Sequence, residues 1–181
     1  MMKPHFSVLV THTQDMHIVD HQGLLPWDTI LNGILERMFI ETKIKPVLIT
    51  GVNTIRSMSK QPQNVHCIVL STHKDAKERY ALPSEVEIYP SLSDALVSLL
   101  PEDNRQIFVS GGCKLIEEAL NHPCCNKIIS NIVVSNKIFG RNLAYKLPPF
   151  DLKKFYIAQA TFLEKSSEGA KSRSVCYYSK N

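Results

Sequence analysis

The chain of 181 residues is predicted to fold as an α/β domain on a mixed, mainly parallel, eight-stranded sheet, with about four flanking helices and a C-terminal antiparallel hairpin. Three observations predict this fold class. Short apolar runs rich in β-branched residues recur along the chain, and helical patterns separate most of them. The central runs lack polar alternation, which is expected of strands that crossover helices bury on both faces. The last two runs are joined by a polar stretch in place of a helix.

The strands are expected at eight runs: Phe6–Thr11, Pro46–Thr50, Val65–Leu70, Glu85–Tyr89, Gln106–Val109, Lys127–Val134, Phe155–Phe162 and Val175–Tyr178. The stretch Glu164–Arg173 between the last two contains one glycine and is otherwise mostly polar. A polar connection of this kind predicts a hairpin, because parallel neighbours need a longer crossover. The sheet should therefore end in an antiparallel edge.

The clearest helix is expected over about Thr29–Thr42, where Asp28 or Thr29 can cap its first turn. Its apolar side chains recur at the helical period: Leu31, Ile34, Leu35, Met38 and Phe39. A second helix should open at Thr54, a third should span Ser91–Leu100, and a fourth should run from the Gly111-Gly112 pair to Leu120. No repeat or linker divides the chain, so residues 1–181 are expected to form one domain.

Composition places the chain among globular proteins, with 44% apolar and 21% charged residues. The formal charge of +4 comes from Lys and Arg scattered along the sequence, which argues against a nucleic-acid partner and suits phosphorylated small molecules. Five cysteines lack metal-ligand or redox spacing, so we expect reduced thiols, no metal and a cytoplasmic location. The first apolar run is too short for a signal peptide or membrane span, and a monomer is expected.

Three strand-to-helix loops are candidate ligand sites, because open α/β sheets bind ligands at the carboxyl ends of their strands. Gly51-Val52-Asn53-Thr54 combines a flexible glycine with a helix start that attracts phosphate, although a plain capped helix explains it too. Leu70-Ser71-Thr72-His73-Lys74 offers hydroxyls and basic groups for a ribose phosphate, with a polar turn as the alternative. Gly111 and Gly112 would admit a pyrophosphate close to the backbone over the next helix.

A fourth loop, Gly23-Leu24-Leu25-Pro26-Trp27, holds the single tryptophan and precedes the long amphipathic helix. With it, the order of motifs becomes specific: Gly-x-Leu-Pro-Trp, helix, Gly-x-x-Thr, Leu-Ser-Thr, Ser-Leu-Ser-Asp-Ala-Leu, Gly-Gly, helix and closing hairpin. This order resembles the dihydrofolate reductase family over nearly the whole chain. The segment Glu118–Pro123 is also similar to its eukaryotic-type members.

The resemblance implies NADPH-dependent hydride transfer to 7,8-dihydrofolate and a role in folate metabolism. It implies that Leu25 and Trp27 belong to a mobile loop beside the pterin, and that other substrate neighbours are Thr11, Asn32, Leu35, Phe39 and Ser130. The implied dinucleotide neighbours are Gly51, Asn53, Thr54, Leu70, Ser71, Thr72, Gly111, Gly112, Cys113, Lys114 and Leu115. A cis peptide bond between Gly111 and Gly112 is also implied.

The family reaction needs a carboxylate on the long helix to hold the pterin and promote protonation at N5. Counting from Trp27 places Asn32 there, whereas counting back from Phe39 places Leu35 there. Glu36 is the nearest acid, one turn beyond Asn32, and it equally fits a solvated surface position. The catalytic candidates are therefore Trp27, Asn32 and Glu36.

Two valines occupy positions where the family has basic residues. Val52 replaces a contact to the cofactor phosphates, and Val65 replaces an arginine that grips the glutamate tail of folate, for which His66 and Lys60 are candidate substitutes. Three functions follow: a slowed reductase that uses Glu36 or an Asn32-bound water, a non-catalytic binding or structural protein, or a reductase of another pterin- or pyrimidine-like heterocycle.

Overall fold

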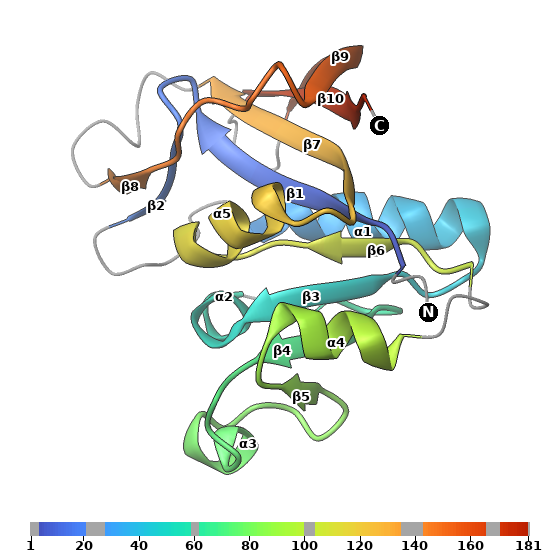
Figure 1. The fold of residues 1–181 in the computed structure, drawn as a ribbon, viewed down its shortest axis with the longest axis vertical. Helices are drawn as coiled ribbons and strands as arrows, with labels where there is room; N and C mark the ends of the chain where they lie inside the picture. Colours follow the sequence, from blue (N-terminus) through green and yellow to red (C-terminus); the bar gives the residue numbers. More distant parts are fainter. Residues whose placement is uncertain are drawn as a thin grey trace.

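The computed structural model describes residues 4–20, 28–58, 62–99, 104–134, 143–165 and 171–180. Its centre is an eight-stranded sheet in the order β5-β4-β3-β6-β1-β7-β10-β9 (Figure 1). The strands are β1 (Phe6–Thr13), β3 (Val47–Gly51), β4 (His66–Leu70), β5 (Glu87–Tyr89), β6 (Ile107–Val109), β7 (Cys125–Val134), β9 (Phe155–Lys165) and β10 (Lys171–Ser179). All eight coincide with the predicted apolar runs.

Strand direction also follows the prediction. Neighbours from β5 to β7 pair in parallel, and only β10 and β9 join antiparallel. The parallel strands are apolar throughout because both of their faces are covered. The expected fold class, a mainly parallel mixed sheet with a C-terminal antiparallel hairpin, is thus confirmed.

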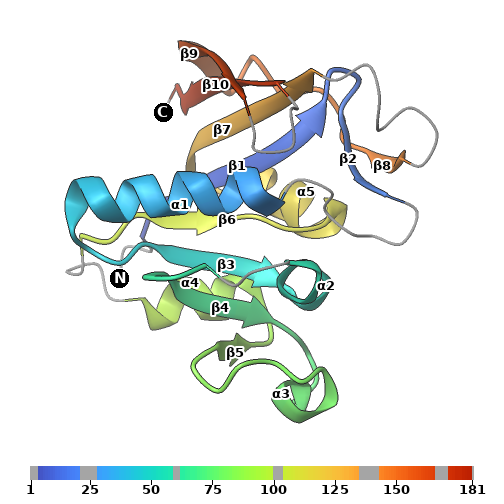
Figure 2. The same ribbon diagram turned by 180° about the vertical axis from the view of Figure 1, so that it is seen from behind.

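Helices cover the two faces of the sheet unequally. The long helix α1 (Asp28–Thr42) lies on one face, and α4 (Leu92–Ser98) and α5 (Cys113–Asn121) lie on the other (Figures 1 and 2). Two shorter helices, α2 (Val52–Ser57) and α3 (Ala76–Arg79), follow β3 and β4. In the described ranges no helix is both long and apolar enough to cross a membrane.

The hydrophobic core is divided by the sheet into two clusters. On the α1 side, Leu35 packs with Leu9, Leu48 and Phe108. On the other side, the apolar faces of α4 and α5 pack on alternate residues of the same strands: Val8, Val10, Ile49, Ile68 and Val109. Successive strand residues therefore face opposite sides, so residue parity tells which face each polar side chain occupies.

Several boundaries differ from the sequence prediction. A second, two-stranded sheet pairs β2 (His17–Asp20) with β8 (Leu143–Lys146), and neither strand was expected. Each is only 4 residues long, and its pairing partner lies far along the chain, so no local pattern marks it. The α3 helix was likewise missed.

The polar connection Glu164–Arg173 was expected to be loop, and this expectation was wrong at its ends. The structure extends β9 to Lys165 and begins β10 at Lys171, with these two residues paired. Hairpin pairing satisfies the backbone whatever the side chains are, so strands continue past the point where the apolar pattern stops. Helices α2 and α4 begin at Val52 and Leu92 and differ from their predicted ends by one or two residues.

Candidate dinucleotide and substrate site

Two of the predicted cofactor loops lie side by side because β3 and β6 are neighbours in the sheet. Ile49 is paired with Val109, and the amide of Ser110 donates a 3.0 Å hydrogen bond to the carbonyl of Ile49. Gly51 and Gly111 therefore leave the sheet together. Their helices α2 and α5 both begin at this edge of the sheet.

Gly111 is the point of closest approach between the two loops. A Cβ atom at this position would lie 3.1 Å from Leu115 Cδ2 and 3.6 Å from both Gly51 N and Thr54 Oγ1. A Cβ atom at Gly112 would have no neighbour within 4 Å. The structure thus brings three predicted residues, Gly51, Thr54 and Leu115, together around Gly111 and leaves open space beside Gly112.

The start of α5 presents the amide groups of its first turn next to that space. Gly112 is its N-cap and makes no side-chain cap bond, so the amides of the first turn lack a capping acceptor. Burial raises the pKa of the Cys113 thiol, an effect that nearby Glu117 adds to, so the thiol stays uncharged there. Lys114 is exposed. A helix start of this kind favours an anionic group such as phosphate.

The peptide bond between Gly111 and Gly112 is trans, as are the other peptide bonds in the described part of the chain. The cis bond implied by the family resemblance is therefore wrong for this structure. Gly112 has φ −71° and ψ 171°, an ordinary extended conformation.

The loop after β4 is built as a polar turn. The Ser71 amide donates to the Tyr89 carbonyl at 2.9 Å, and the Ser71 hydroxyl accepts from the His73 amide at 3.2 Å. Leu70 is paired with Gly51, which places the loop beside the Gly51 turn, and Thr72 is exposed. The loop after β4 therefore adjoins the Gly51 loop but not the Gly111 loop, and its serine is already engaged by the backbone.

A basic cluster beside this loop was missed by the sequence analysis. The guanidinium carbons of Arg56 and Arg79 lie 5.9 and 5.8 Å from the ring centroid of Tyr80, and the His73 ring lies 6.1 Å from it. Arginine stacks on aromatic rings in this way. The density of basic residues after Thr72 was the available signal, but only the fold adds Arg56 of α2.

The predicted substrate residues Thr11 and Ser130 lie on opposite faces of the sheet. Ser130 pairs with Val10, and Asn131 pairs with Thr11. Asn131 therefore shares the α1 face with Thr11, whereas Ser130 faces the side of α5. The structure does not bring Thr11 and Ser130 together, and it substitutes Asn131, which the sequence analysis did not single out.

Two buried polar atoms on the α1 side have no hydrogen-bond partner among the described residues: Asn131 Nδ2 and Thr50 Oγ1. The Asn131 carbonyl oxygen accepts a bond from the Ser174 hydroxyl, which fixes the amide. Buried polar groups are normally satisfied. The two atoms lie on β7 and β3, which β6 and β1 separate, so each would need its own partner from a ligand or water.

The predicted site residues of the long helix α1 differ in how deeply they are buried. Leu35 is fully buried in the core, Phe39 is half-buried, and Glu36 is exposed. The solvated reading of Glu36 is the one that the structure favours. Asn32 lies in α1, but its side chain is outside what the structure describes, as are Leu25 and Trp27.

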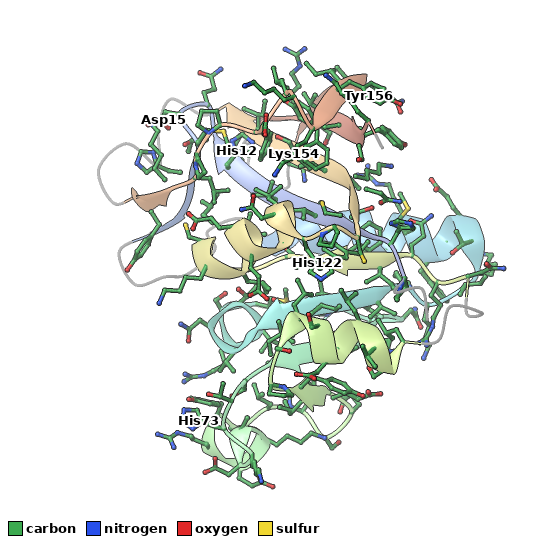
Figure 3. The ribbon with its side chains drawn as sticks, viewed as in Figure 1. His12, Asp15, His73, His122, Lys154 and Tyr156 are labelled. Atoms are coloured by element: carbon green, nitrogen blue, oxygen red, sulfur yellow. The ribbon has the colours of Figure 1, made fainter. Side chains whose placement is uncertain are left out.

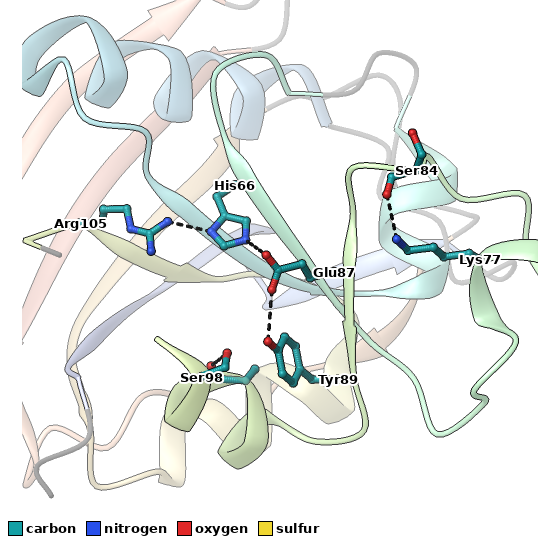
Figure 4. A network of polar contacts seen from close by, with 8 residues as sticks. His66, Lys77, Ser84, Glu87, Tyr89, Ser98 and Arg105 are labelled. Carbon is teal, nitrogen blue, oxygen red and sulfur yellow. Dashed lines mark hydrogen bonds and ion pairs between the residues drawn. The ribbon is translucent and has the colours of Figure 1, made fainter. Parts of the chain in front are cut away.

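The proposed substitutes for the tail-binding arginine are placed as follows. Val65 packs against the core on the α1 side, while His66 Nε2 lies 2.8 Å from Glu87 Oε1 and His66 Nδ1 lies 2.8 Å from Arg105 (Figure 4). His66 thus already has a hydrogen-bond partner on each ring nitrogen. Lys60 lies outside the described residues. No group of three His, Cys, Asp or Glu side chains in the described ranges is placed to hold a metal.

His12 is a buried histidine at the end of β1 (Figure 3). Its Nδ1 lies 2.6 Å from the Thr13 carbonyl and its Nε2 lies 2.6 Å from the Ser130 hydroxyl, while the Phe150 ring packs edge-on at 6.0 Å. A carbonyl only accepts, so Nδ1 carries the hydrogen and Nε2 accepts from the serine. Burial lowers the pKa of His12, an effect that the Thr13 bond partly opposes. The neutral ring is therefore the folded form.

We predict that His12 makes the protein less stable in mild acid. The lowered pKa means that stability is fully present above the unfolded pKa of about 6.5 and is lost as pH falls from there toward the folded pKa. Urea unfolding should show a slope of at most about 1.4 kcal/mol per pH unit in this window, which His12→Gln should flatten. His73→Gln, at an exposed site, is the matched control.

The carboxylate of Asp15 acts at a lower pH. Its pKa is lowered to about 2 by a hydrogen bond from Thr13 and by His17, so it loses its contribution only in stronger acid. A slope between pH 6.5 and 5 that survives His12→Gln but disappears in His73→Gln would contradict the assignment to His12.

Comparison with known proteins agrees with the geometry. The family model described as dihydrofolate reductase matches residues 5–180. No curated protein matches the chain significantly. Because the matched range spans nearly the whole sequence, and the observed sheet order carries the glycine loops to one edge, the chain belongs to the dihydrofolate reductase family.

Proposed function

We propose that this protein binds NADPH and reduces 7,8-dihydrofolate by hydride transfer, at a rate held down by slow protonation of the substrate. The observation that carries the proposal is the convergence of Gly51, Thr54 and Gly111 beside the uncapped start of α5. Family membership supports the reaction class. A role in folate metabolism in the cytoplasm follows, and the five free cysteines agree with a reducing compartment.

The described residues fit a dinucleotide. The open space at Gly112 and the free amides of α5 suit its pyrophosphate, and the neutral Cys113 thiol adds no repulsion. Arg56 and Arg79, which share the Tyr80 ring with His73, would bind the phosphate that distinguishes NADPH from NADH. We therefore assign NADPH, and these arginines take over from the basic residue that Val52 replaces.

Bound NADPH would supply the hydride. The chain's own residues would position the heterocycle on the α1 face, where Asn131 Nδ2 can donate to a ring acceptor. Phe39 of α1 offers a half-buried aromatic wall. Asn32 lies seven residues before Phe39, nearly two turns, so it belongs to the same side of the helix. We propose that Asn32 orients the water that protonates the substrate.

A second candidate function is ligand binding without turnover. It is favoured by the absence of an acidic side chain among the buried residues that the structure describes: the buried polar groups of the α1 face, Thr11, Thr50 and Asn131, are all neutral. Replacing a well-placed ionic contact by a neutral one costs about 1.5–3 kcal/mol. A reductase that lacks this contact would be slowed by roughly ten- to a hundredfold or more.

A paired measurement separates these two functions. NADPH should quench protein fluorescence on binding, and absorbance should then fall slowly on addition of dihydrofolate. Binding of NADPH with no absorbance change would show that the protein binds its ligand without turnover. Absence of binding to either compound would exclude both functions.

Substitution at Gly112 tests the position of the dinucleotide. Gly112→Ala should leave the melting temperature unchanged because its Cβ meets no atom within 4 Å, yet it should weaken NADPH binding by roughly tenfold or more, since the new methyl group occupies ligand space. Gly111→Ala is the comparison variant, because its Cβ must displace the tip of Leu115 at 3.1 Å. Unchanged NADPH affinity in Gly112→Ala would move the pyrophosphate elsewhere.

Restoring a carboxylate tests the catalytic assignment. Asn32→Asp should raise the rate of dihydrofolate reduction by roughly tenfold or more, because an ionised acid can hold the pterin and promote its protonation. Glu41→Gln, exposed in the last turn of the same helix, makes the same charge change as Glu36→Gln and should leave the rate unchanged. If Glu36→Gln lost activity and Asn32→Asp left it unaltered, Glu36 and not Asn32 would be the residue that promotes protonation of the substrate.

A further inference from the structure

Asn131 holds a buried hydrogen-bond donor that nothing in the described part of the chain satisfies. The residue belongs to β7, which lies between β1 and β10, and 1% of its surface is exposed (Figure 1). Its Nδ2 atom has no hydrogen-bond partner among the described residues. Burying an amide group without a partner is costly, so an atom of this kind normally meets a ligand or a water.

Ser174 decides which side of the Asn131 amide is left without a partner. The two residues are paired across the antiparallel strands β7 and β10, and the Ser174 hydroxyl donates to Asn131 Oδ1. The oxygen and nitrogen lie on opposite sides of the planar amide group, so holding the oxygen turns the nitrogen away from Ser174. Asn131 therefore offers a donor, and not an acceptor, to a group that approaches Nδ2.

The surroundings of this donor are neutral. Thr11 is the partner of Asn131 on β1, and the preceding β7 residue on this face, Ile129, packs in the apolar cluster with Leu9. No carboxylate is buried in the part of the chain that the structure describes. The described residues thus supply Asn131 with no charged group that could compete for the ligand.

A fixed donor in neutral surroundings selects a ring by the edge that the ring presents to it. A ring carbonyl accepts a hydrogen bond from Nδ2, whereas a ring amino group is itself a donor and would leave both N–H groups unpaired. A site built around one directed hydrogen bond rejects analogues that cannot complete it. Asn131 should therefore favour oxo rings over amino rings.

We propose that Asn131 is a specificity-determining residue that selects heterocycles with a carbonyl group facing β7, and that Ser174 is the positioning residue that fixes its amide. The inference rests on the proposed function in placing a heterocycle on the α1 face, and it adds the class of ring that binds there. Dihydrofolate qualifies because its pterin ring carries a carbonyl group, which would lie toward Asn131. Diamino analogues of the same ring do not qualify.

The test uses the full chain and the dimethyl derivatives of three rings of one shape: lumazine with two carbonyl groups, pterin with one carbonyl and one amino group, and diaminopteridine with two amino groups. Ring fluorescence follows binding at a pH where all three rings are neutral. Lumazine and pterin should each bind roughly tenfold or more tightly than diaminopteridine. In ¹H–¹⁵N NMR spectra, the side-chain amide signals of Asn131 should shift with the two oxo rings and not with diaminopteridine.

Asn131→Asp tests the donor itself. The variant puts an acceptor where Nδ2 was, so the order should reverse and diaminopteridine should bind more tightly than lumazine. Asn121→Asp is the matched control, because Asn121 is exposed at the end of α5 and donates to the Glu117 carbonyl. It should leave the order of the three rings unchanged.

Ser174→Ala tests the positioning role. Without the serine hydroxyl the amide can turn over and present its oxygen, so the preference for oxo rings should fall to about threefold or less. A purely structural role would weaken all three rings alike and keep their ratio. Ser57→Ala removes another half-buried hydroxyl, which donates to the Thr54 carbonyl, and should keep the ratio as well.

Two results would overturn the proposal: diaminopteridine binding as tightly as both oxo rings, or an oxo preference that persists unchanged in a folded Asn131→Asp variant. If Asn131→Asp does not fold, the order of the rings in the native protein and their ratio in Ser174→Ala still decide. Reduction of dihydrofolate without any oxo preference would remove this inference and leave the proposed function standing. Oxo-selective binding without reduction would do the reverse.

Discussion

The candidate site depends on the parallel pairing of β3 with β6. The bond from the Ser110 amide to the Ile49 carbonyl closes this pairing at the carboxyl edge, and from there both chains turn into helices. The separation of neighbouring strands is set by backbone hydrogen bonds, so Gly51 and Gly111 must leave the sheet within contact distance. A side chain at Gly111 would crowd this junction, while the adjacent Gly112 keeps the start of α5 accessible. The proposed dinucleotide position follows from this constraint.

The two faces of the sheet carry different polar chemistry. On the α1 side, Asn131 and Thr50 hold buried atoms without partners in the described chain, which is costly unless a ligand or water satisfies them. On the α5 side, both nitrogens of His12 are satisfied, one by Ser130 and the other by the Thr13 carbonyl. The first pair therefore suits binding, and the second stabilises the end of β1 in its neutral state. Strand alternation alone assigns each residue to its side.

The two ends of the sheet also differ in charge arrangement. At the carboxyl end, backbone amides and the Arg56–Tyr80–Arg79 cluster favour phosphate groups. At the amino end, His66 lies between Arg105 and Glu87, with one ring nitrogen 2.8 Å from each partner. The carboxyl end therefore favours anions through backbone dipoles and stacked arginines, whereas at the amino end the cation and the carboxylate are joined through His66.

The sequence by itself determined the eight main strands, the long helix, the antiparallel hairpin and the three glycine- or hydroxyl-bearing loops. These features follow from local periodicity and turn chemistry, which are properties of neighbouring residues and do not depend on the tertiary structure. Tertiary structure alone decided the β2–β8 ribbon, the position of Asn131 in place of Ser130 and the contacts of His66 with Arg105 and Glu87. Each of these features depends on strand register or on contact between distant segments. Register and distant contacts are not encoded in the spacing of neighbouring residues.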